Sequence, residues 1–259
     1  MNWMDKVGNT EPGKGQLAVF WLGQAGFLLK TDNGHTIAID PYLSEYVEHL
    51  FPDMAPGFKR LMPPPCGAGE LCADSLLISH DHGDHFDAES ISALMQNGHT
   101  RVYTNTVVAG LMDTMQLDME RVTVLQKGDT VALFSGCALT AVDADHGDLA
   151  PDALGFLLRF GRKTVYFAGD TALTPERLAL PLQTKPDIAL LPINGAFGNL
   201  SGVQAARYAQ MLECKVLVPC HFWTFPLHHG DPQELIDAMP LEAPDVSLQL
   251  LCQGEALID

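Results

Sequence analysis

Three imidazoles and two carboxylates are crowded into six consecutive positions directly after a short apolar run. The run is Ser75-Leu76-Leu77-Ile78-Ser79, and the segment that follows it reads His80-Asp81-His82-Gly83-Asp84-His85. A short apolar run bounded by polar residues predicts a buried strand, so these side chains are expected at the mouth of a strand. Nitrogen and oxygen ligands at this density suit zinc, manganese or iron. The segment therefore predicts a metal site that activates water, with a polar loop whose histidines cap a helix as the alternative.

Further ligands are expected at the ends of other predicted strands. His146 follows the apolar run 138–142, Asp170 follows 165–168, and His221 follows 216–220. Taken singly, a histidine or aspartate at a strand end is more often a turn former. Three of them at matching positions strengthen one another as candidate ligands. Asp81 falls on the alternate position of the motif and is left out of the ligand set.

Composition limits the classes of protein that remain. The chain has 259 residues, enough for one substantial core, and we expect a single domain over 1–259. The formal charge of −17 disfavours a nucleic-acid substrate, because such a surface repels phosphates. The apolar runs are too short for a membrane span, and the N-terminus has no signal pattern. We expect a cytoplasmic protein with a small-molecule substrate and no membrane partner.

The six cysteines form no Cys-x-x-Cys pair, which is typical of reduced thiols. Cys137, Cys214, Cys220 and Cys252 are expected in the core. Cys66 and Cys72 flank a glycine-rich loop, and the sequence leaves their role open.

The chain reads as two similar halves of strands and helices. In the first half we expect strands at 17–22, 27–30, 36–40 and 102–104, a long loop over 41–72, and helices at 87–95 and 107–115. In the second half we expect strands at 122–125, 130–133, 138–142, 155–160, 164–168, 187–191, 215–219 and 246–251, with helices at 202–212 and 232–239. Each half runs from antiparallel strands into strand–helix units. The predicted fold is α/β, with two sheets face to face and helices on the outer faces.

These motifs resemble the metallo-β-lactamase superfamily, whose hallmark is His-x-His-x-Asp-His followed by a His, an Asp and a final His. The stretches Phe20–Gly26, Ser79–His85, Ala168–Thr171 and Lys215–His221 are similar to its ascorbate-6-phosphate lactonase branch. The resemblance implies a four-layer αββα sandwich and two divalent metal ions, zinc or manganese in first place and iron as an alternative. It also implies that His80, His82 and His146 hold one ion, that Asp84, His85 and His221 hold the other, and that Asp170 bridges both.

The implied chemistry is hydrolysis of a lactone or phosphoester by metal-activated water, with Asp84 steering a proton to the leaving group. Asn194 is a candidate substrate contact, with a turn-forming Asn-Gly as the equal alternative. His229 is a candidate proton donor or substrate contact, against a surface histidine. Lys59 and Arg60 are interpreted as solvated charges, with anion binding as the alternative.

Three other functions compete with this hypothesis. A phosphodiesterase stays within the hydrolase class. An iron-dependent oxidoreductase of the same fold is the second, although diiron relatives generally carry Glu where this chain keeps His82. A non-enzymatic metal-binding module is the third, and the complete set of seven ligands argues against it. A homo-oligomer is left open, since no self-association signal is visible.

Overall fold

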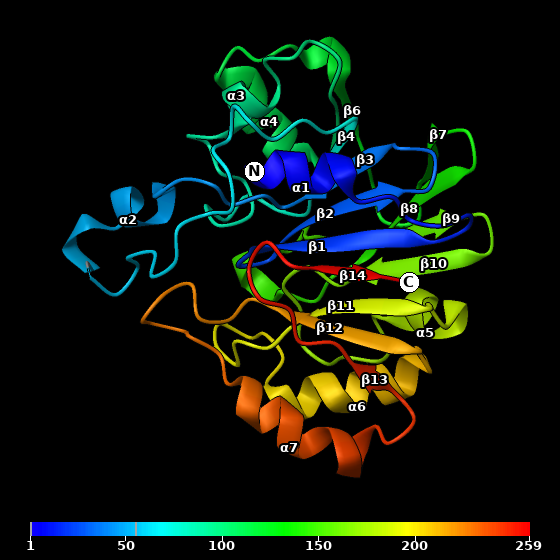
Figure 1. The fold of residues 1–259 in the computed structure, drawn as a ribbon. Helices are drawn as coiled ribbons and strands as arrows, with labels where there is room; N and C mark the ends of the chain where they lie inside the picture. Colours follow the sequence, from blue (N-terminus) through cyan, green and yellow to red (C-terminus); the bar gives the residue numbers. More distant parts are fainter. Residues whose placement is uncertain (1, 55) are drawn as a thin grey trace. The chain divides into compact units, whose positions relative to one another are not determined.

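The computed structural model describes residues 2–54 and 56–259, and it divides into two compact units. Unit 1 comprises the chain up to Leu125 together with Thr224–Leu227 and Leu251–Asp259. Unit 2 comprises Gln126–Trp223 and His228–Leu250. Each unit contains one seven-stranded mixed sheet with helices beside it (Figure 1).

The sheet of unit 1 has the strand order β14-β1-β2-β3-β4-β5-β6. Its strands are β1 (Leu17–Gly23), β2 (Gly26–Thr31), β3 (Thr36–Ile39), β4 (Ser75–Ile78), β5 (Arg101–Thr104), β6 (Val122–Val124) and β14 (Ala256–Ile258). The pairs from β14 to β3 are antiparallel, and those from β3 to β6 are parallel. Strands β3 and β4 are therefore parallel neighbours, and their carboxyl ends meet at one edge of the sheet.

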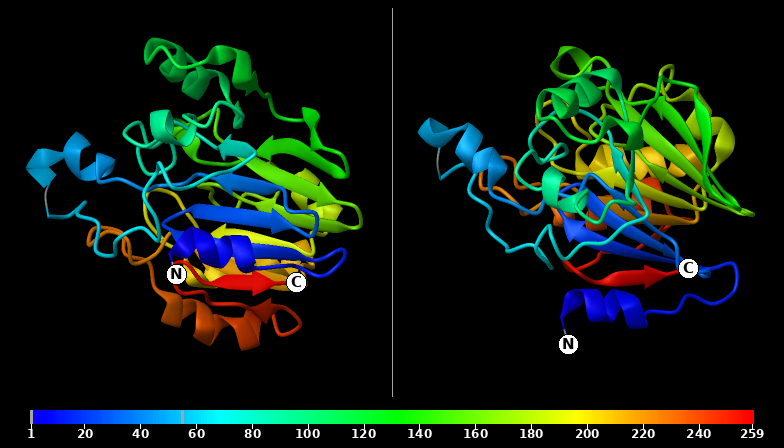
Figure 2. Two further views of the ribbon diagram at one scale, coloured as in Figure 1. Left: turned by 45° about the horizontal axis from the view of Figure 1, so that its top comes forward. Right: turned by 90° about the horizontal axis from the view of Figure 1, so that it is seen from above.

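Helices cover one face of this sheet. They are α1 (Trp3–Asn9), α3 (Ile91–Leu94) and α4 (Thr106–Thr114), while α2 (Tyr46–Leu50) and two 3₁₀ turns (Pro52–Met54 and Met119–Arg121) lie in connecting segments. Alternate residues of β1, such as Phe20 and Leu22, pack in one core cluster with Val7 of α1, Ile91 of α3 and Met112 of α4. Because strand side chains alternate between faces, this set defines the helix-covered face. Figure 2 shows α1 running beside β14, where Trp3 donates from Nε1 to the Gly254 carbonyl at 2.9 Å.

The sheet of unit 2 has the strand order β13-β12-β11-β10-β9-β8-β7. Its strands are β7 (Thr130–Phe134), β8 (Cys137–Asp143), β9 (Leu154–Phe160), β10 (Lys163–Phe167), β11 (Ile188–Pro192), β12 (Val216–Cys220) and β13 (Ser247–Leu248). The pairs from β7 to β10 are antiparallel, and those from β10 to β13 are parallel. The two sheets thus repeat one plan, which confirms the expected two similar halves. The strand expected at 122–125 in the second half is instead β6 of the first sheet, because it pairs with β5.

Three helices belong to unit 2, namely α5 (Ala179–Thr184), α6 (Gly202–Leu212) and α7 (Pro232–Glu242), with a 3₁₀ turn at Gly147–Leu149. Helix α6 begins with a capping box, in which Ser201 and Gln204 each accept a hydrogen bond from the other's backbone N–H. Helices α6 and α7 lie side by side (Figure 1). A Cβ added to Gly202 would lie 2.6 Å from the backbone nitrogen of Leu235, so only glycine fits at this crossing.

The α/β prediction with two sheets and flanking helices is confirmed, and helix 202–212 has the expected bounds. The helix expected over 87–95 is shorter, because it begins only at Ile91. The carboxylate of Asp87 accepts hydrogen bonds from the Ser90 backbone and hydroxyl, which holds residues 87–90 as a turn. The strand expected over 246–251 is reduced to Ser247–Leu248.

Burial confirms most of the cysteine predictions. Cys137, Cys214 and Cys220 are buried as expected, whereas Cys252 is exposed, because it lies in a turn where its backbone N–H donates to the Glu255 carboxylate. Burial raises the pKa of Cys66 to about 12, which disfavours a thiolate there.

Among the residues that the structure describes, we find no helix long and apolar enough to cross a bilayer. The expectation of a single domain over 1–259 stays a prediction.

We expect Gly202→Ala to lower the free energy of unfolding by about 2–3 kcal/mol, because the added methyl group forces α6 away from α7. The matched control is Gly110→Ala in α4, where a Cβ meets nothing within 4 Å. That control should raise the free energy of unfolding by about 0.5–1 kcal/mol. Urea titration of both variants tests the pair, and equal stability of the two would contradict the helix packing described here.

Candidate metal centre

In unit 1 the histidine motif forms a tight turn directly after β4. The backbone nitrogens of His85 and Phe86 both donate to the His82 carbonyl, at 2.9 and 2.8 Å. This turn brings the imidazoles together, because the ring centroid of His80 lies 4.5 Å from that of His82 and 4.1 Å from that of His85. His80 and His85 are buried, whereas His82 and Asp84 are half-buried. The local sequence alone therefore gathers the four predicted ligands of unit 1.

A buried carboxylate orients two of these rings. Asp40 follows β3 and is fully buried; it accepts hydrogen bonds from the Ser79 backbone at 2.8 Å, the Ser79 hydroxyl at 2.5 Å and His85 Nδ1 at 2.7 Å. The Ser79 hydroxyl also lies 2.9 Å from His80 Nδ1. Since both rings are engaged through Nδ1, Nε2 is the atom by which each ring would bind a metal.

Asp84 is held from the neighbouring hairpin turn. Its Oδ2 accepts a hydrogen bond from Gln24 Nε2 at 2.8 Å, and the same oxygen lies 3.8 Å from His85 Nε2. The backbone nitrogen of Gln24 in turn donates to the Thr224 hydroxyl at 3.1 Å. These contacts fix the rotation of the Asp84 carboxylate.

In unit 2 the three predicted ligands lie together at strand ends. Asp170 follows β10, His146 follows β8, and His221 follows β12. Asp170 divides its carboxylate between the two histidines, because Oδ2 lies 3.7 Å from His146 Nε2 and Oδ1 lies 3.3 Å from His221 Nε2. All three side chains are buried. Each oxygen of the Asp170 carboxylate therefore faces a different imidazole.

An ion-pair network supports the His146 segment. Arg177 pairs with Asp143 and Asp145, and Lys127 pairs with Asp143 at 2.6 Å. Burial by itself would raise the pKa of Asp143, but hydrogen bonds from Arg177 and Lys127 hold that pKa below its usual value. The Asp145 backbone also donates to the Thr171 hydroxyl at 2.9 Å, which ties this segment to the residue after Asp170.

The predicted substrate contacts fall into different environments. Asn194 follows β11 and is buried, and its Nδ2 lies 3.5 Å from His228 Nδ1. The His228 ring lies 5.5 Å from the ring of His221. His229 is exposed, and its carbonyl accepts a hydrogen bond from the Trp223 backbone at 2.6 Å. The role predicted for His229 stays a prediction, while the adjacent His228 is the ring beside Asn194.

The sequence interpretation missed four residues that support the site, namely Gln24, Asp40, Asp143 and Arg177. Asp40 carried a usable signal, since it is an acidic residue at the end of a predicted strand, like Asp170. The other three have partners that are distant along the chain: 60 residues for Gln24, 34 for Asp143 and 32 for Arg177. No local sequence pattern predicts such pairs.

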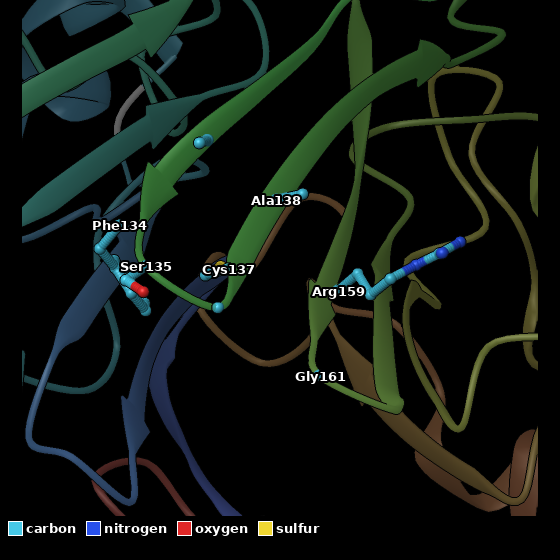
Figure 3. Close-up of a pocket in the computed structure, with 8 residues that line it drawn as sticks. Phe134, Ser135, Cys137, Ala138, Arg159 and Gly161 are labelled. Carbon is cyan, nitrogen blue, oxygen red and sulfur yellow. The ribbon is translucent and has the colours of Figure 1, made fainter.

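A hollow elsewhere in unit 2 has the wrong composition for this chemistry. It has a volume of about 390 Å³ at the β7–β8 hairpin and is lined by residues that include Phe134, Cys137 and Arg159 (Figure 3). It contains no predicted ligand, and we assign it no catalytic role.

The sequence of this chain is similar to that of known metal-dependent proteins. The model of the Beta-lactamase superfamily domain matches residues 18–221. A UPF0173 metal-dependent hydrolase of Hyperthermus butylicus is 30% identical over 236 residues, covering 89% of this chain and 96% of the relative. A UPF0173 metal-dependent hydrolase of Rubrobacter xylanophilus is 32% identical over 232 residues, covering 85% and 87%.

A solved structure shows the same fold. Igni18, described as a novel metallo hydrolase from Ignicoccus hospitalis, superposes with a TM-score of 0.72 at 23% identity, covering 94% of this chain and 98% of Igni18. The predicted metallo-β-lactamase type of fold is therefore confirmed. The donor set also fits the metal dependence of the relatives, because imidazole nitrogens lie beside carboxylate oxygens within each unit. The chain belongs to the β-lactamase superfamily and is a metal-dependent hydrolase with the metallo-β-lactamase fold.

Proposed function

We propose that the chain hydrolyses a small lactone or phosphoester at a centre of two divalent ions, zinc or manganese, with iron as the alternative. The proposed ligands are His80, His82 and His146 for one ion, Asp84, His85 and His221 for the other, and Asp170 for both. The observation that carries the proposal is the division of the Asp170 oxygens between His146 and His221. A carboxylate that bridges two ions offers one oxygen to each, and this division of the two oxygens suits that role.

The ions supply positive charge that polarises the substrate and acidifies a water molecule. The protein residues position the reacting groups. Gln24 holds Asp84 Oδ2, and we assign the other oxygen, Oδ1, to take a proton and deliver it to the leaving group. The Asp40–Ser79 pair keeps the proton of His85 on Nδ1.

Two buried amides support recognition of a polar substrate. The Asn194 Oδ1 atom and both side-chain polar atoms of Asn199 are buried, and none has a hydrogen-bond partner within the described part of the chain. Unpartnered buried amides are costly, so a ligand that donates and accepts hydrogen bonds is favoured here. We assign the neighbouring contact to His228, whose Nδ1 lies 3.5 Å from Asn194 Nδ2. His229 is exposed.

The ascorbate-6-phosphate lactonase branch supplies the finer form of this proposal, a sugar-acid phosphate lactone as substrate. A phosphodiesterase and an iron-dependent oxidoreductase are the competing functions. Elemental analysis of untagged protein, followed by a panel of lactones and phosphodiesters with the metal found, separates them. A stoichiometric iron content with visible absorbance and no hydrolysis would favour the oxidoreductase.

We expect His82→Ala and Asp170→Ala each to lower metal-dependent turnover by roughly 10³-fold or more, because each removes a proposed ligand. Both variants should keep the circular dichroism spectrum of the wild type. The control is His99→Ala, which removes an exposed histidine of unit 1 and should leave turnover and metal content unchanged. Full turnover in either ligand variant would contradict the proposed centre.

We expect Asp40→Asn to weaken metal binding roughly 10- to 100-fold, because the new amide donates where the carboxylate accepted and so moves the His85 proton to Nε2. The free energy of unfolding should fall by about 1–3 kcal/mol, since buried hydrogen bonds are lost. Competition with a chromophoric chelator measures the affinity. Asp53→Asn, at an exposed carboxylate in the same unit, is the matched control. Wild-type affinity in Asp40→Asn would show that Asp40 does not orient the ligand.

A further inference from the structure

The segment expected as a loop over 41–72 has a folded arm within unit 1. We call the part that contains α2 and the 3₁₀ turn Pro52–Met54 the arm. The arm stands away from the sheet of its own unit in both views of Figure 2. A separate apolar cluster holds this arm, made by Tyr42, Val47, Phe58 and Phe225 with Tyr46 packed against them. A Cβ on Gly83 would lie 2.8 Å from Leu50 and 3.2 Å from Tyr46, so the arm packs directly on the histidine motif.

Arg60 lies inside this arm, which overturns its interpretation as a solvated charge. Its side chain is only 8% exposed, whereas the adjacent Lys59 is exposed as expected. The guanidinium donates from Nε to the Met62 carbonyl and from Nη1 to the Tyr42 carbonyl, both at 2.7 Å. It also lies over the Tyr42 ring at 4.8 Å. The backbone has folded around this cation.

The buried charge of Arg60 lacks a bonded counterion. Over residues 2–54 and 56–259 it makes no ion pair, and its Nη2 nitrogen is buried with no hydrogen-bond partner. Buried guanidinium groups are normally paired, because an unpaired charge in a protein interior is costly. Two neighbouring carboxylates, Asp87 and Glu45, lessen that cost through their charge alone.

Neither carboxylate is placed to complete the pairing. The carboxylate of Asp87 is saturated by donors from Leu43, Ser44 and Ser90. Glu45 is exposed to solvent, and although it lines the same hollow as Arg60, the described residues show no ion pair between the two. Arg60 therefore keeps donor capacity that the described residues do not use.

Arg60 lines a hollow that is suited to a small molecule. The hollow has a volume of about 340 Å³, within the range of ligand sites. Its walls are formed by Leu43, Ser44, Glu45, Arg60, Leu61, Met62, Pro63 and Pro64. The walls are mixed, because Ser44 and Glu45 stand beside the apolar residues. The buried guanidinium favours a planar or tetrahedral oxyanion, which arginine binds through two parallel hydrogen bonds.

We propose that this hollow is an anion subsite in which Arg60 binds a carboxylate or phosphate group of the substrate. The assignment to the substrate rests on the proposed function. It is supported by proximity, because Gly83 of the histidine motif lies against Tyr46. Tyr46 packs in the same cluster as Tyr42, and the Arg60 guanidinium lies over the Tyr42 ring. If the anionic group of a substrate binds here, the rest of the substrate lies near the histidine motif of the same unit.

The test titrates the purified full-length protein with inorganic phosphate and, separately, with acetate. Calorimetry gives the affinity, and the ¹⁵N–¹H signal of Arg60 Nε reports binding at this residue. We expect saturable binding of at least one anion, with a shift of that signal. Arg60→Gln should weaken binding roughly tenfold or more, Arg60→Lys should weaken it less, and Lys59→Gln should change it less than twofold.

Two results would overturn the subsite. One is an Arg60 Nε signal that moves with neither anion, and the other is undiminished binding in a folded Arg60→Gln variant. In either case the role of Arg60 is limited to its hydrogen bonds to the Tyr42 and Met62 carbonyls. If Arg60→Gln does not fold, the wild-type Nε titration decides alone. Phosphate binding at Arg60 does not depend on His82 or Asp170, so wild-type turnover in His82→Ala would refute the metal centre and leave the subsite standing.

Discussion

The buried carboxylate of Asp40 is the constraint on which the histidine motif of unit 1 depends. Strands β3 and β4 are parallel neighbours, so Asp40 and Ser79 come to the same edge of the sheet. Burying the carboxylate would cost several kcal/mol without donors, and Ser79 and His85 supply them. The same bonds orient the rings of His80 and His85. The fold thus sets the direction of these ligands through hydrogen bonds that need no metal.

The sequence predicts those site residues that are consecutive in the chain or that directly follow a predicted strand. Backbone hydrogen bonds within the histidine motif close its turn. The order of consecutive residues is therefore enough to predict that its four proposed ligands lie together. Asp170 and His221 follow runs whose apolar character marks buried parallel strands, and parallel strands deliver their carboxyl ends to one edge. This is why a one-dimensional pattern predicted which side chains of unit 2 lie together.

The parts that it does not predict depend on contacts distant along the chain. Strand β14 has only three residues and exists because it pairs with β1. Helix α1 is held by Trp3 and Lys6, which both donate to the carbonyl of Gly254. Arg60 has the sequence context of a surface residue, after an exposed lysine. It becomes a buried cation only because the Tyr42 and Met62 carbonyls fold back to accept its hydrogen bonds. Burial of a polar residue is a tertiary property that composition does not report.

Three residues that hold the proposed chemistry have strained backbone conformations. Gln24, Asp40 and His221 all have left-handed backbone conformations, with φ of 50°, 41° and 60°. Such conformations cost non-glycine residues about 1–2 kcal/mol each. Glycine would relieve the strain but would remove the amide that holds Asp84, the carboxylate that orients His85, and a proposed ligand. At these positions the need for a particular side chain outweighs the preference of the backbone, and buried hydrogen bonds such as those of Asp40 offset the cost.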